Sequence, residues 1–451
     1  MTLAENRSAW LETELTRVDG QSPRETETAP LGKHLKMAGN PFVFLRGAAQ
    51  LFYADINAGY LNLPEALYTL PKTHIMGDCH TSNFGFFTEE GSHGDRVVFA
   101  PNDFDDACVG HAVWDLARYA VSLVLCADYC RGLSEGTYQP KEAGEKDYTG
   151  KASVKAGSAE QAVRQFLKGY QQRCEMLIAS PDYHQQVLTD FPDDHILSKP
   201  FHKAKARAAG GADFLFKSSL AKAVDVDAEA LRFRDRADKF KRLNADEYAA
   251  LEQAFAPYMD DQVLDIVARL DAGTGSVNMS RYYLLVGPAD YQGQQDLNLC
   301  HIVEVKQQRK AAPLFYFTDL SPVNRLNPAH LTLECQRRMQ RFPDLILDEA
   351  EYGGGHWLVR SRHHAKVGLD PENVALGKKA RKGGFEEYAA TCGHALALAH
   401  GRGDRRSVRY EQAVVKLLPE QTDAFVTACL EYAQQAKDDW RLLNQMLGQE
   451  V

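Results

Sequence analysis

Two short strings near the start of the sequence carry residue types that phosphoryl transfer requires. Residues 77–83 (GDCHTSN) place an Asn five positions after an Asp, and residues 102–107 (NDFDDA) add further carboxylates. In phosphotransferases a carboxylate orients or deprotonates the acceptor hydroxyl, while an Asn and a second Asp hold Mg²⁺ against the triphosphate. We therefore predict Asp78 as the catalytic carboxylate and Asn83 and Asp103 as metal ligands.

The predicted ligands are oxygen donors, which suit Mg²⁺ because it prefers one or two carboxylates completed by water and phosphate oxygens. The apolar run 97–99 predicts a strand that ends before Asp103 and delivers it to the site. Asp105 and Asp106 are spare carboxylates, and either could replace Asp103. We expect His80 to orient the loop through a hydrogen bond.

A second set of residues, far downstream, has the order of a nucleotide-binding lobe. Residues 273–277 (GTGSV) contain two glycines whose bare backbone can close over phosphates. We predict Gly273, Gly275 and Ser276 as nucleotide-contacting residues. A strand-like run at 281–286 follows them.

The next strand-like run, 301–306, ends in a lysine. A strand lysine can bridge two phosphates if a helix carboxylate fixes its amine. We predict Lys306 in this role. Its predicted ion-pair partner is Glu334, on the amphipathic segment 331–339.

The chain resembles the domain-of-unknown-function 2252 family, through residues 40–47 (NPFVFLRG), the two strings above and segments out to His400 and Asp404. This resemblance covers most of the chain. Residues 102–117 are also similar to the metal-binding segment of aminoglycoside and choline phosphotransferases, in which an aspartate lies at the position of Asp103. The second resemblance implies that Asp115 braces the catalytic loop.

The order of these elements differs from that of a kinase, where the glycine loop, lysine and glutamate precede the catalytic loop. Only 77 residues precede Asp78, and the three elements follow it instead. We therefore predict an α+β, protein-kinase-like two-lobed fold that is circularly permuted, with a mainly α catalytic lobe and a small β-rich nucleotide lobe. Termini usually lie at the surface and close together, so permutation leaves core contacts intact.

Four parts are predicted along the chain: a polar, loosely docked N-terminal arm (1–35), an α-rich catalytic and metal-binding lobe (36–270), a β-rich nucleotide lobe with one helix (271–362), and C-terminal helices that complete the α lobe (363–451). The segment 131–158 is rich in Gly, Lys and Glu. We expect it to be an exposed insertion that shapes the acceptor cleft.

Composition bounds these predictions. A chain of 451 residues with 44% hydrophobic content can fill two lobes. The net charge of −9 disfavours nucleic acid as the main partner, and we interpret the basic segment 199–222 as a solvated face. No apolar run predicts a membrane span. Nine cysteines without a Cys-x-x-Cys, and no signal-like start, predict reduced thiols and a cytoplasmic protein.

The predicted function is an ATP- and Mg²⁺-dependent kinase-like phosphotransferase acting on an unknown hydroxyl acceptor, either a small molecule or a protein. Three alternatives remain open. A reversed nucleotide would give nucleotidyl (AMP) transfer. The Asp78-x-His80 spacing is typical of a metal-dependent phosphoesterase, although its further ligand strings are absent from the sequence. The third alternative is a non-catalytic nucleotide-binding pseudokinase. The oligomeric state is left open.

Overall fold

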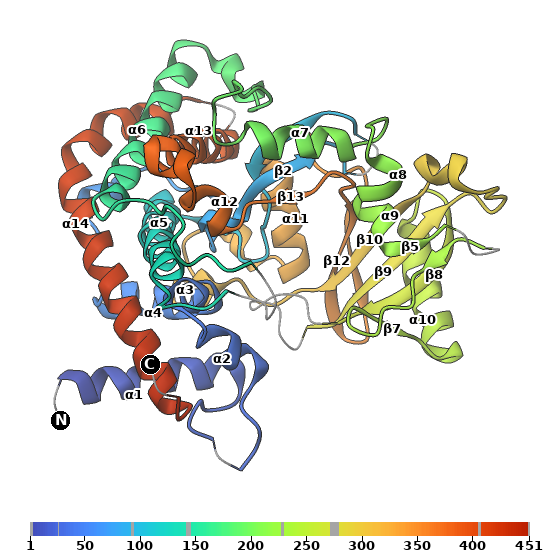
Figure 1. Ribbon diagram of the computed structural model, residues 1–451, viewed down its shortest axis with the longest axis horizontal. Coiled ribbons are helices and arrows are strands. Elements are labelled where there is room, and N and C mark those ends of the chain that lie inside the picture. The colour runs from blue at the N-terminus through green and yellow to red at the C-terminus, as the bar shows by residue number, and fades with distance from the viewer. Residues whose placement is uncertain are drawn as a thin grey trace.

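The computed structural model describes residues 3–25, 27–91, 94–140, 146–226, 230–270, 279–404 and 407–449. It is a mixed α+β structure in which a large helical part lies beside a six-stranded antiparallel sheet (Figure 1). This confirms the predicted α+β class. No helix within the described ranges is long and apolar enough to cross a membrane.

The helical part is built around the long helix α5. It comprises α1 (Leu3–Asp19), α2 (Gly32–Met37), α3 (Pro41–Gly47), α4 (Ala49–Ala58), α5 (Ala112–Glu135), α6 (Ser158–Ala179), α12 (Pro371–Ala375), α13 (Phe385–Gly403) and α14 (Arg409–Met446). Helix α5 is apolar around most of its circumference and is buried accordingly.

Helices α6 and α13 approach each other closely. A Cβ added at Gly393 would lie 2.1 Å from the Phe166 carbonyl oxygen, and one added at Gly169 would lie 2.4 Å from the Ala390 carbonyl oxygen. Only glycine fits at these two contact positions. The contact fixes α13, whose last turn lies against β1.

The sheet part follows in the sequence. Its strands, in spatial order, are β11 (Leu347–Tyr352), β12 (Gly355–Arg362), β10 (His301–Gln307), β9 (Arg281–Gly287), β8 (Gln262–Arg269) and β7 (Phe240–Arg242), and its helices are α10 (Ala245–Phe255) and α11 (Pro328–Met339). Leu251 and Phe255 of α10 share an apolar core with Val303 and Val305 of β10. Helix α10 therefore covers one face of the sheet.

The opposite face of the sheet looks toward the helical part. Lys306 lies opposite Leu358 in the register, and Glu304 lies opposite Arg360, so these four side chains share that face. Leu333 of α11 packs against Leu358 and covers one end of it. The charged middle of the face is turned toward the helical part, where Lys306 pairs with Asp105.

A bridging segment covers the other end of this face. It consists of α7 (Ser198–Arg207), α8 (Phe214–Lys217) and α9 (Ser219–Ala223), followed by the short strand β5 (Val224–Asp225), which pairs with β6 (Arg232–Phe233). Phe214 and Leu220 share a core with Tyr283 and Ile302 of the sheet.

Two small sheets hold the N-terminal strings. Strand β1 (Thr73–Ile75) pairs with β4 (Cys108–Gly110), and β2 (Phe84–Thr88) pairs with both β3 (Val97–Pro101) and β13 (Val367–Gly368). Residues 77–83 lie between β1 and β2, and residues 102–107 lie between β3 and β4. Strand β3 agrees with the strand predicted before Asp103.

The N-terminal segment differs from the predicted loosely docked arm. Arg7 of α1 forms buried ion pairs with Asp55 (2.7 Å) and with Asp439 of α14 (2.5 Å), and Trp10 Nε1 donates to Asp55 (2.9 Å). The two buried carboxylates require a cation, and α1 supplies it. Helices α1 and α14, the first and last described helices, consequently lie against each other (Figure 1).

This docking makes a prediction about stability. Arg7→Met leaves two carboxylates buried without a counter-charge, so we expect the free energy of unfolding to fall by about 3–5 kcal/mol. Urea denaturation measures it. Arg24→Met is the matched control, because Arg24 pairs with Glu12 at the surface and exposed pairs contribute only about 0–1 kcal/mol. Equal small effects in both variants would contradict the docking role of Arg7.

Candidate functional site

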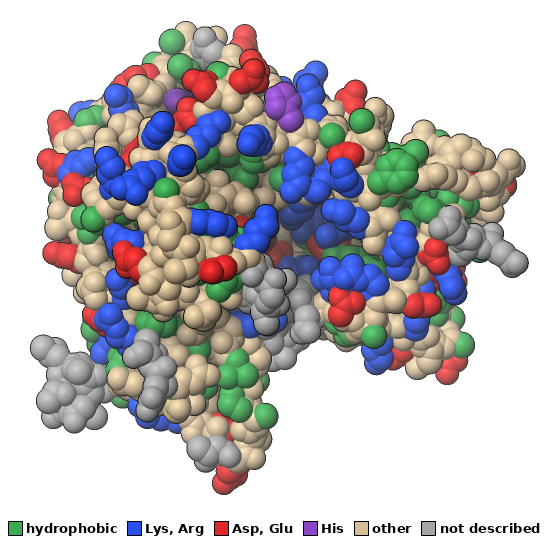
Figure 2. Space-filling view, in the orientation of Figure 1, with side chains coloured by type: hydrophobic (Ala, Val, Ile, Leu, Met, Phe, Trp, Pro, Cys, Tyr) green, Lys and Arg blue, Asp and Glu red, His purple; other side chains and the backbone are tan. Residues whose placement is uncertain are grey.

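Residues from both halves of the chain meet where the sheet faces the helical part. The Lys306 ammonium pairs with Asp105, and Arg309 donates to both oxygens of Asp106 at 2.9 and 3.0 Å. Figure 2 shows Lys and Arg side chains gathered around a hollow between the two parts, which we call the cleft. The structure thus brings Lys306 to the carboxylates of the second string.

Asp78 lies at the cleft with its side chain 20% exposed. Its Oδ1 accepts a hydrogen bond of 2.6 Å from Nε of Arg118, a fully buried residue of α5. Nη2 of Arg118 also donates to the Leu45 carbonyl oxygen (2.8 Å). Burial alone would lower the pKa of Arg118, but Asp78 outweighs it and raises the pKa. Arg118 therefore fixes the orientation of Asp78.

Asp115, fully buried at the start of α5, holds the backbone that leads into Asp78. Its two oxygens accept hydrogen bonds from the amides of Met76 (2.7 Å) and Gly77 (3.0 Å). His400 Nε2 lies 3.0 Å from Asp115, and Nδ1 of the same ring lies 2.7 Å from the Tyr170 hydroxyl. These hydrogen bonds hold the backbone in front of Asp78, as the resemblance to aminoglycoside and choline phosphotransferases implies for Asp115.

Gly77 makes the tight turn that follows. Its φ of 73° is in the left-handed region, and an added Cβ would lie 1.8 Å from the Asp106 carbonyl oxygen. The Tyr53 hydroxyl donates to the Gly77 carbonyl (2.6 Å). The turn therefore packs the first string against the second.

Asn83 turns back onto the first string. Its Nδ2 donates to the Asp78 carbonyl oxygen (2.9 Å), which leaves Oδ1 as the atom that could meet a cation. The amide of Asn102 donates to the Asn83 carbonyl (3.0 Å) and joins the two strings. Asn83 and Asp103 are thereby held on adjoining backbone.

Asp103 differs from its two neighbouring carboxylates. Asp105 and Asp106 are each paired with a cation, whereas Asp103 has no ion pair within the described residues. Burial would raise its pKa, but the positive charges of Lys306, Arg360 and others outweigh burial and lower it. Asp103 is therefore the carboxylate of the second string that is free to bind a cation.

The Lys306 ammonium is enclosed by charge of both signs. Burial lowers the pKa of Lys306 to about 7, with Asp103 opposing this shift and Arg360, Arg309 and Lys366 adding to it. Binding of an anion would favour the protonated form. An anion bound next to Lys306 would therefore raise the pKa of its ammonium group.

The predicted ion pair between Lys306 and Glu334 is wrong. Glu334 pairs instead with Arg338 on its own helix (2.7 Å). The predicted helix exists as α11, but Thr332 and Gln336 are its buried polar residues on this side. Glu334 is two positions from each of them, about 200° around the helix, so it points away from Lys306. The predicted Gly273, Gly275 and Ser276 lie outside the described residues.

Sequence reasoning missed the arginine cluster on the sheet. Glu304 is surrounded by Arg281 (3.3 Å), Arg360 (2.9 Å) and Arg362 (3.8 Å), and these charges hold the pKa of Glu304 far below its usual range against burial. A pocket adjoins the cluster. It is lined by Asn102, Glu304, Gln336, Gln340, Arg360, Ser361, Arg362, His363 and Lys366. The sequence did contain one indication of this cluster. Side chains of a strand alternate between its two faces, so Glu304 and Lys306, two positions apart, must share a face.

Two further cations face the cleft without an ion pair among the described residues. Burial lowers the pKa of Lys366 to about 8. Burial also lowers the pKa of Arg46, against the opposing charges of Asp78, Asp370 and Asp103. The Nε of Arg46 is buried without a hydrogen-bond partner. Arg46 and Lys366 are therefore available to an anionic ligand.

His80 and Cys79 are both buried beside Asp78. Burial lowers the pKa of His80 well below its usual value, and its Nε2 lies 3.6 Å from Asp78, longer than a hydrogen bond. Burial also raises the pKa of the Cys79 thiol, which argues against a nucleophile. All nine cysteines are buried and unpaired.

The described residues contain no group of three His, Cys, Asp or Glu side chains arranged to hold a metal ion. A Mg²⁺ site does not need one, because phosphate oxygens and water complete it. The open carboxylate of Asp103 and the Oδ1 of Asn83 fit that requirement.

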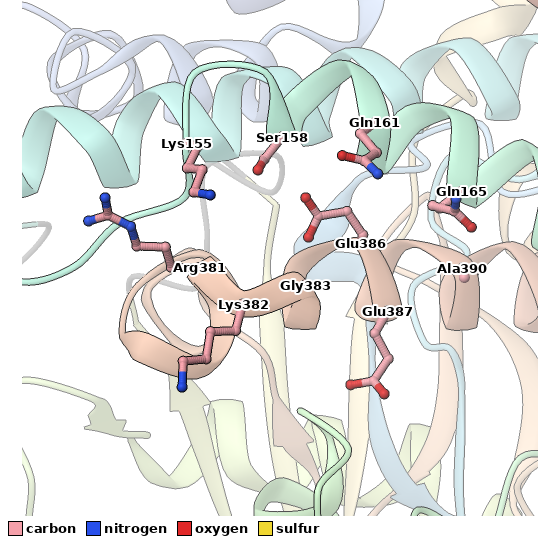
Figure 3. Close-up of a pocket in the computed structure, with 10 residues that line it drawn as sticks. All are labelled: Lys155, Ser158, Gln161, Gln165, Arg381, Lys382, Gly383, Glu386, Glu387 and Ala390. Atoms are coloured by element: carbon pink, nitrogen blue, oxygen red, sulfur yellow. The ribbon is translucent and has the colours of Figure 1, made fainter.

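A separate pocket opens between the starts of α6 and α13 (Figure 3). Lys155 and Arg381 lie at one end of it, and Glu386 points from α13 toward Ser158 and Gln161. This pocket contains none of the predicted site residues. The end of the predicted insertion, at Lys155 and Ser158, therefore lines this pocket.

The fold and site together define an α+β protein with a cationic cleft between a helical part and an antiparallel sheet. Residues 24–139 and 149–446 match the model of a family described as "Uncharacterized protein conserved in bacteria (DUF2252)". The chain belongs to this family. No curated protein and no solved structure matches it.

The Asp115 brace gives a second prediction. Asp115→Asn keeps the side-chain size but offers an amide NH₂ to a backbone N–H, so we expect a loss of about 1–3 kcal/mol in stability and faster hydrogen exchange at Met76 and Gly77. Denaturation and amide exchange measure these effects. Asp438→Asn, at an exposed pair on α14, is the control. Unchanged exchange at the two amides would contradict the brace.

Proposed function

We propose that the protein is an ATP- and Mg²⁺-dependent phosphotransferase acting on a hydroxyl acceptor. The observation that carries this proposal is the meeting of Lys306 with the second string, close to Asp103. These residues come from opposite halves of the chain. A strand lysine facing a metal-binding aspartate is the arrangement that phosphoryl transfer from a nucleotide uses.

The proposal includes a kinase-like, circularly permuted arrangement. The sheet part has the order strand pair, strand with Lys306, helix α11, strand pair, as in a nucleotide lobe. The end of α13 contacts β1, the strand that leads into the first string, since Thr73 Oγ1 donates to the His400 carbonyl (2.8 Å). Helix α13 thus lies next to the strand that leads into the first string. In the sequence, however, α13 follows that string by some 300 residues. The contact between the first and last described helices is what a permutation requires.

Each site residue has a role in this proposal. Asp78, oriented by Arg118, accepts the proton of the acceptor hydroxyl. The hydroxyl oxygen bonds to the terminal phosphorus of ATP, and the bond from that phosphorus to ADP breaks, so that ADP leaves. Asn83 and Asp103 hold Mg²⁺, which when bound neutralises phosphate charge. The Lys306 ammonium leaves its ion pair with Asp105 and pairs instead with the phosphates of ATP.

A nucleotidyl transferase is the second candidate, favoured by one observation. In a kinase-like fold β12 would run into the segment that contacts adenine, yet here it carries Arg360 and Arg362 and is followed by Lys366. These cations suit phosphates better than a base. A reversed nucleotide would release pyrophosphate, whereas phosphoryl transfer releases ADP, so the released product separates the two.

Nucleotide binding tests the proposal. We expect ATP to bind the wild type only with Mg²⁺, and Lys306→Met and Asp103→Asn each to weaken binding at least tenfold, because each removes a charge from the site. Isothermal titration calorimetry measures this. Glu334→Gln is the control, since Glu334 faces away, and Asp105→Asn should keep the Mg²⁺ dependence. If ATP does not bind to the folded wild-type protein, the proposal is refuted.

Protonation of Lys306 gives a further test. Its pKa of about 7 means that the amine is mostly deprotonated at pH 8, and we expect phosphate binding to restore the charged form. We expect ATP binding to take up protons at pH 8, and less so at pH 6. Titration in buffers of different ionisation enthalpy measures the uptake. Lys306→Arg stays charged and should abolish this component; equal uptake in both proteins would exclude Lys306.

A further inference from the structure

The bridging segment carries a cluster of basic side chains, which we call the α7–α9 cluster: Lys203, Arg207 and Lys222. None of the three has an ion-pair partner among the described residues, and the Arg207 Nε is buried without a hydrogen bond. Burial lowers the pKa of Lys222, and Arg207, Lys203, Lys217 and Lys239 lower it further. Four cations therefore act electrostatically on Lys222, and of these Lys217 is itself paired with Asp213 (3.1 Å).

The cluster is held in place beside the cleft. The Ser219 amide donates to the His364 carbonyl (3.0 Å), and the Phe214 ring lies 5.1 Å from the His364 ring. His364 lies two residues before Lys366, which has no ion pair in the part of the chain that the structure describes. Figure 1 places α7 to α9 above the strands of the large sheet, and in the same orientation Figure 2 shows basic side chains along the upper margin of the hollow.

A line of charges connects the cluster to Asp78. Asp370 acts electrostatically on Lys203 and also on Arg46. Arg46 in turn lies within range of Asp78 and Asp103. Asp370 thus links the α7–α9 cluster electrostatically to Arg46, which lies within range of the predicted catalytic carboxylate.

Lys203, Arg207 and Lys222 have no ion-pair partner among the described residues, so their like charges repel one another, and a bound anion would lower that cost. The chain as a whole carries a net charge of −9, which repels a long polyanion such as nucleic acid. A small anion responds mainly to charges within a Debye length of about 8–10 Å. The cluster therefore fits a compact ligand with more than one negative group.

We propose that the α7–α9 cluster binds the phosphate groups of a small, multiply charged acceptor whose hydroxyl reaches Asp78. The anion site stands on the cluster itself, and its assignment to the acceptor rests on the proposed function. This replaces the interpretation of the segment as a merely solvated face.

Inorganic pyrophosphate is the probe. It is titrated calorimetrically into the full chain saturated with Mg²⁺ and a non-hydrolysable ATP analogue, which fills the donor site. We expect binding to the wild type, at least tenfold weaker binding to the triple variant Lys203→Gln/Arg207→Gln/Lys222→Gln, and unchanged affinity of that variant for the analogue. The control triple variant Lys168→Gln/Arg409→Gln/Lys416→Gln removes the same charge from exposed positions on α6 and α14 and should bind as the wild type does.

The outcomes separate the two proposals. No pyrophosphate binding to the wild type, or equal binding to the α7–α9 triple variant, overturns the anion site. An equal loss of pyrophosphate affinity in both triple variants would mean that only the net charge of the protein matters. This result would also overturn the anion site. A single-stranded oligonucleotide that binds the cluster more tightly than pyrophosphate overturns the small-ligand assignment. Failure of the analogue to bind the wild type refutes the proposed function, while titration without the analogue still tests the cluster.

Discussion

The candidate site depends on one buried carboxylate. Asp115 accepts hydrogen bonds from the Met76 and Gly77 amides and contacts His400, so it joins α5, the first string and the end of α13. A buried carboxylate is costly unless its oxygens are satisfied. The bonds that satisfy Asp115 also fix the backbone from which Asp78 projects. Arg118, one turn further along α5, then orients the Asp78 carboxylate.

Ion pairs across the cleft perform a second task. Lys306 to Asp105 and Arg309 to Asp106 tie the sheet part to the helical part. They use two of the three carboxylates of the second string and leave Asp103 open. Among the described residues Arg46 and Lys366 have no ion pair, which supports the proposed binding of an anion together with a divalent cation.

Local sequence patterns predicted much of this arrangement. The α+β class, the strand before Asp103, the strand ending at Lys306 and the helix over 331–339 are present in the structure. Each rests on a periodicity or spacing contained in a short segment. The acceptor assigned to the cluster, and the nucleotide itself, remain proposals.

The sequence by itself determined which chemical groups the chain offers and which short elements carry them, because hydrophobic periodicity and residue type are local properties. Only the tertiary structure decided which groups meet. It paired Lys306 with Asp105, turned Glu334 toward Arg338, docked α1 through Arg7 and placed Arg360 beside Glu304. Such pairings depend on packing angles and on the desolvation of distant charges, which no segment encodes alone.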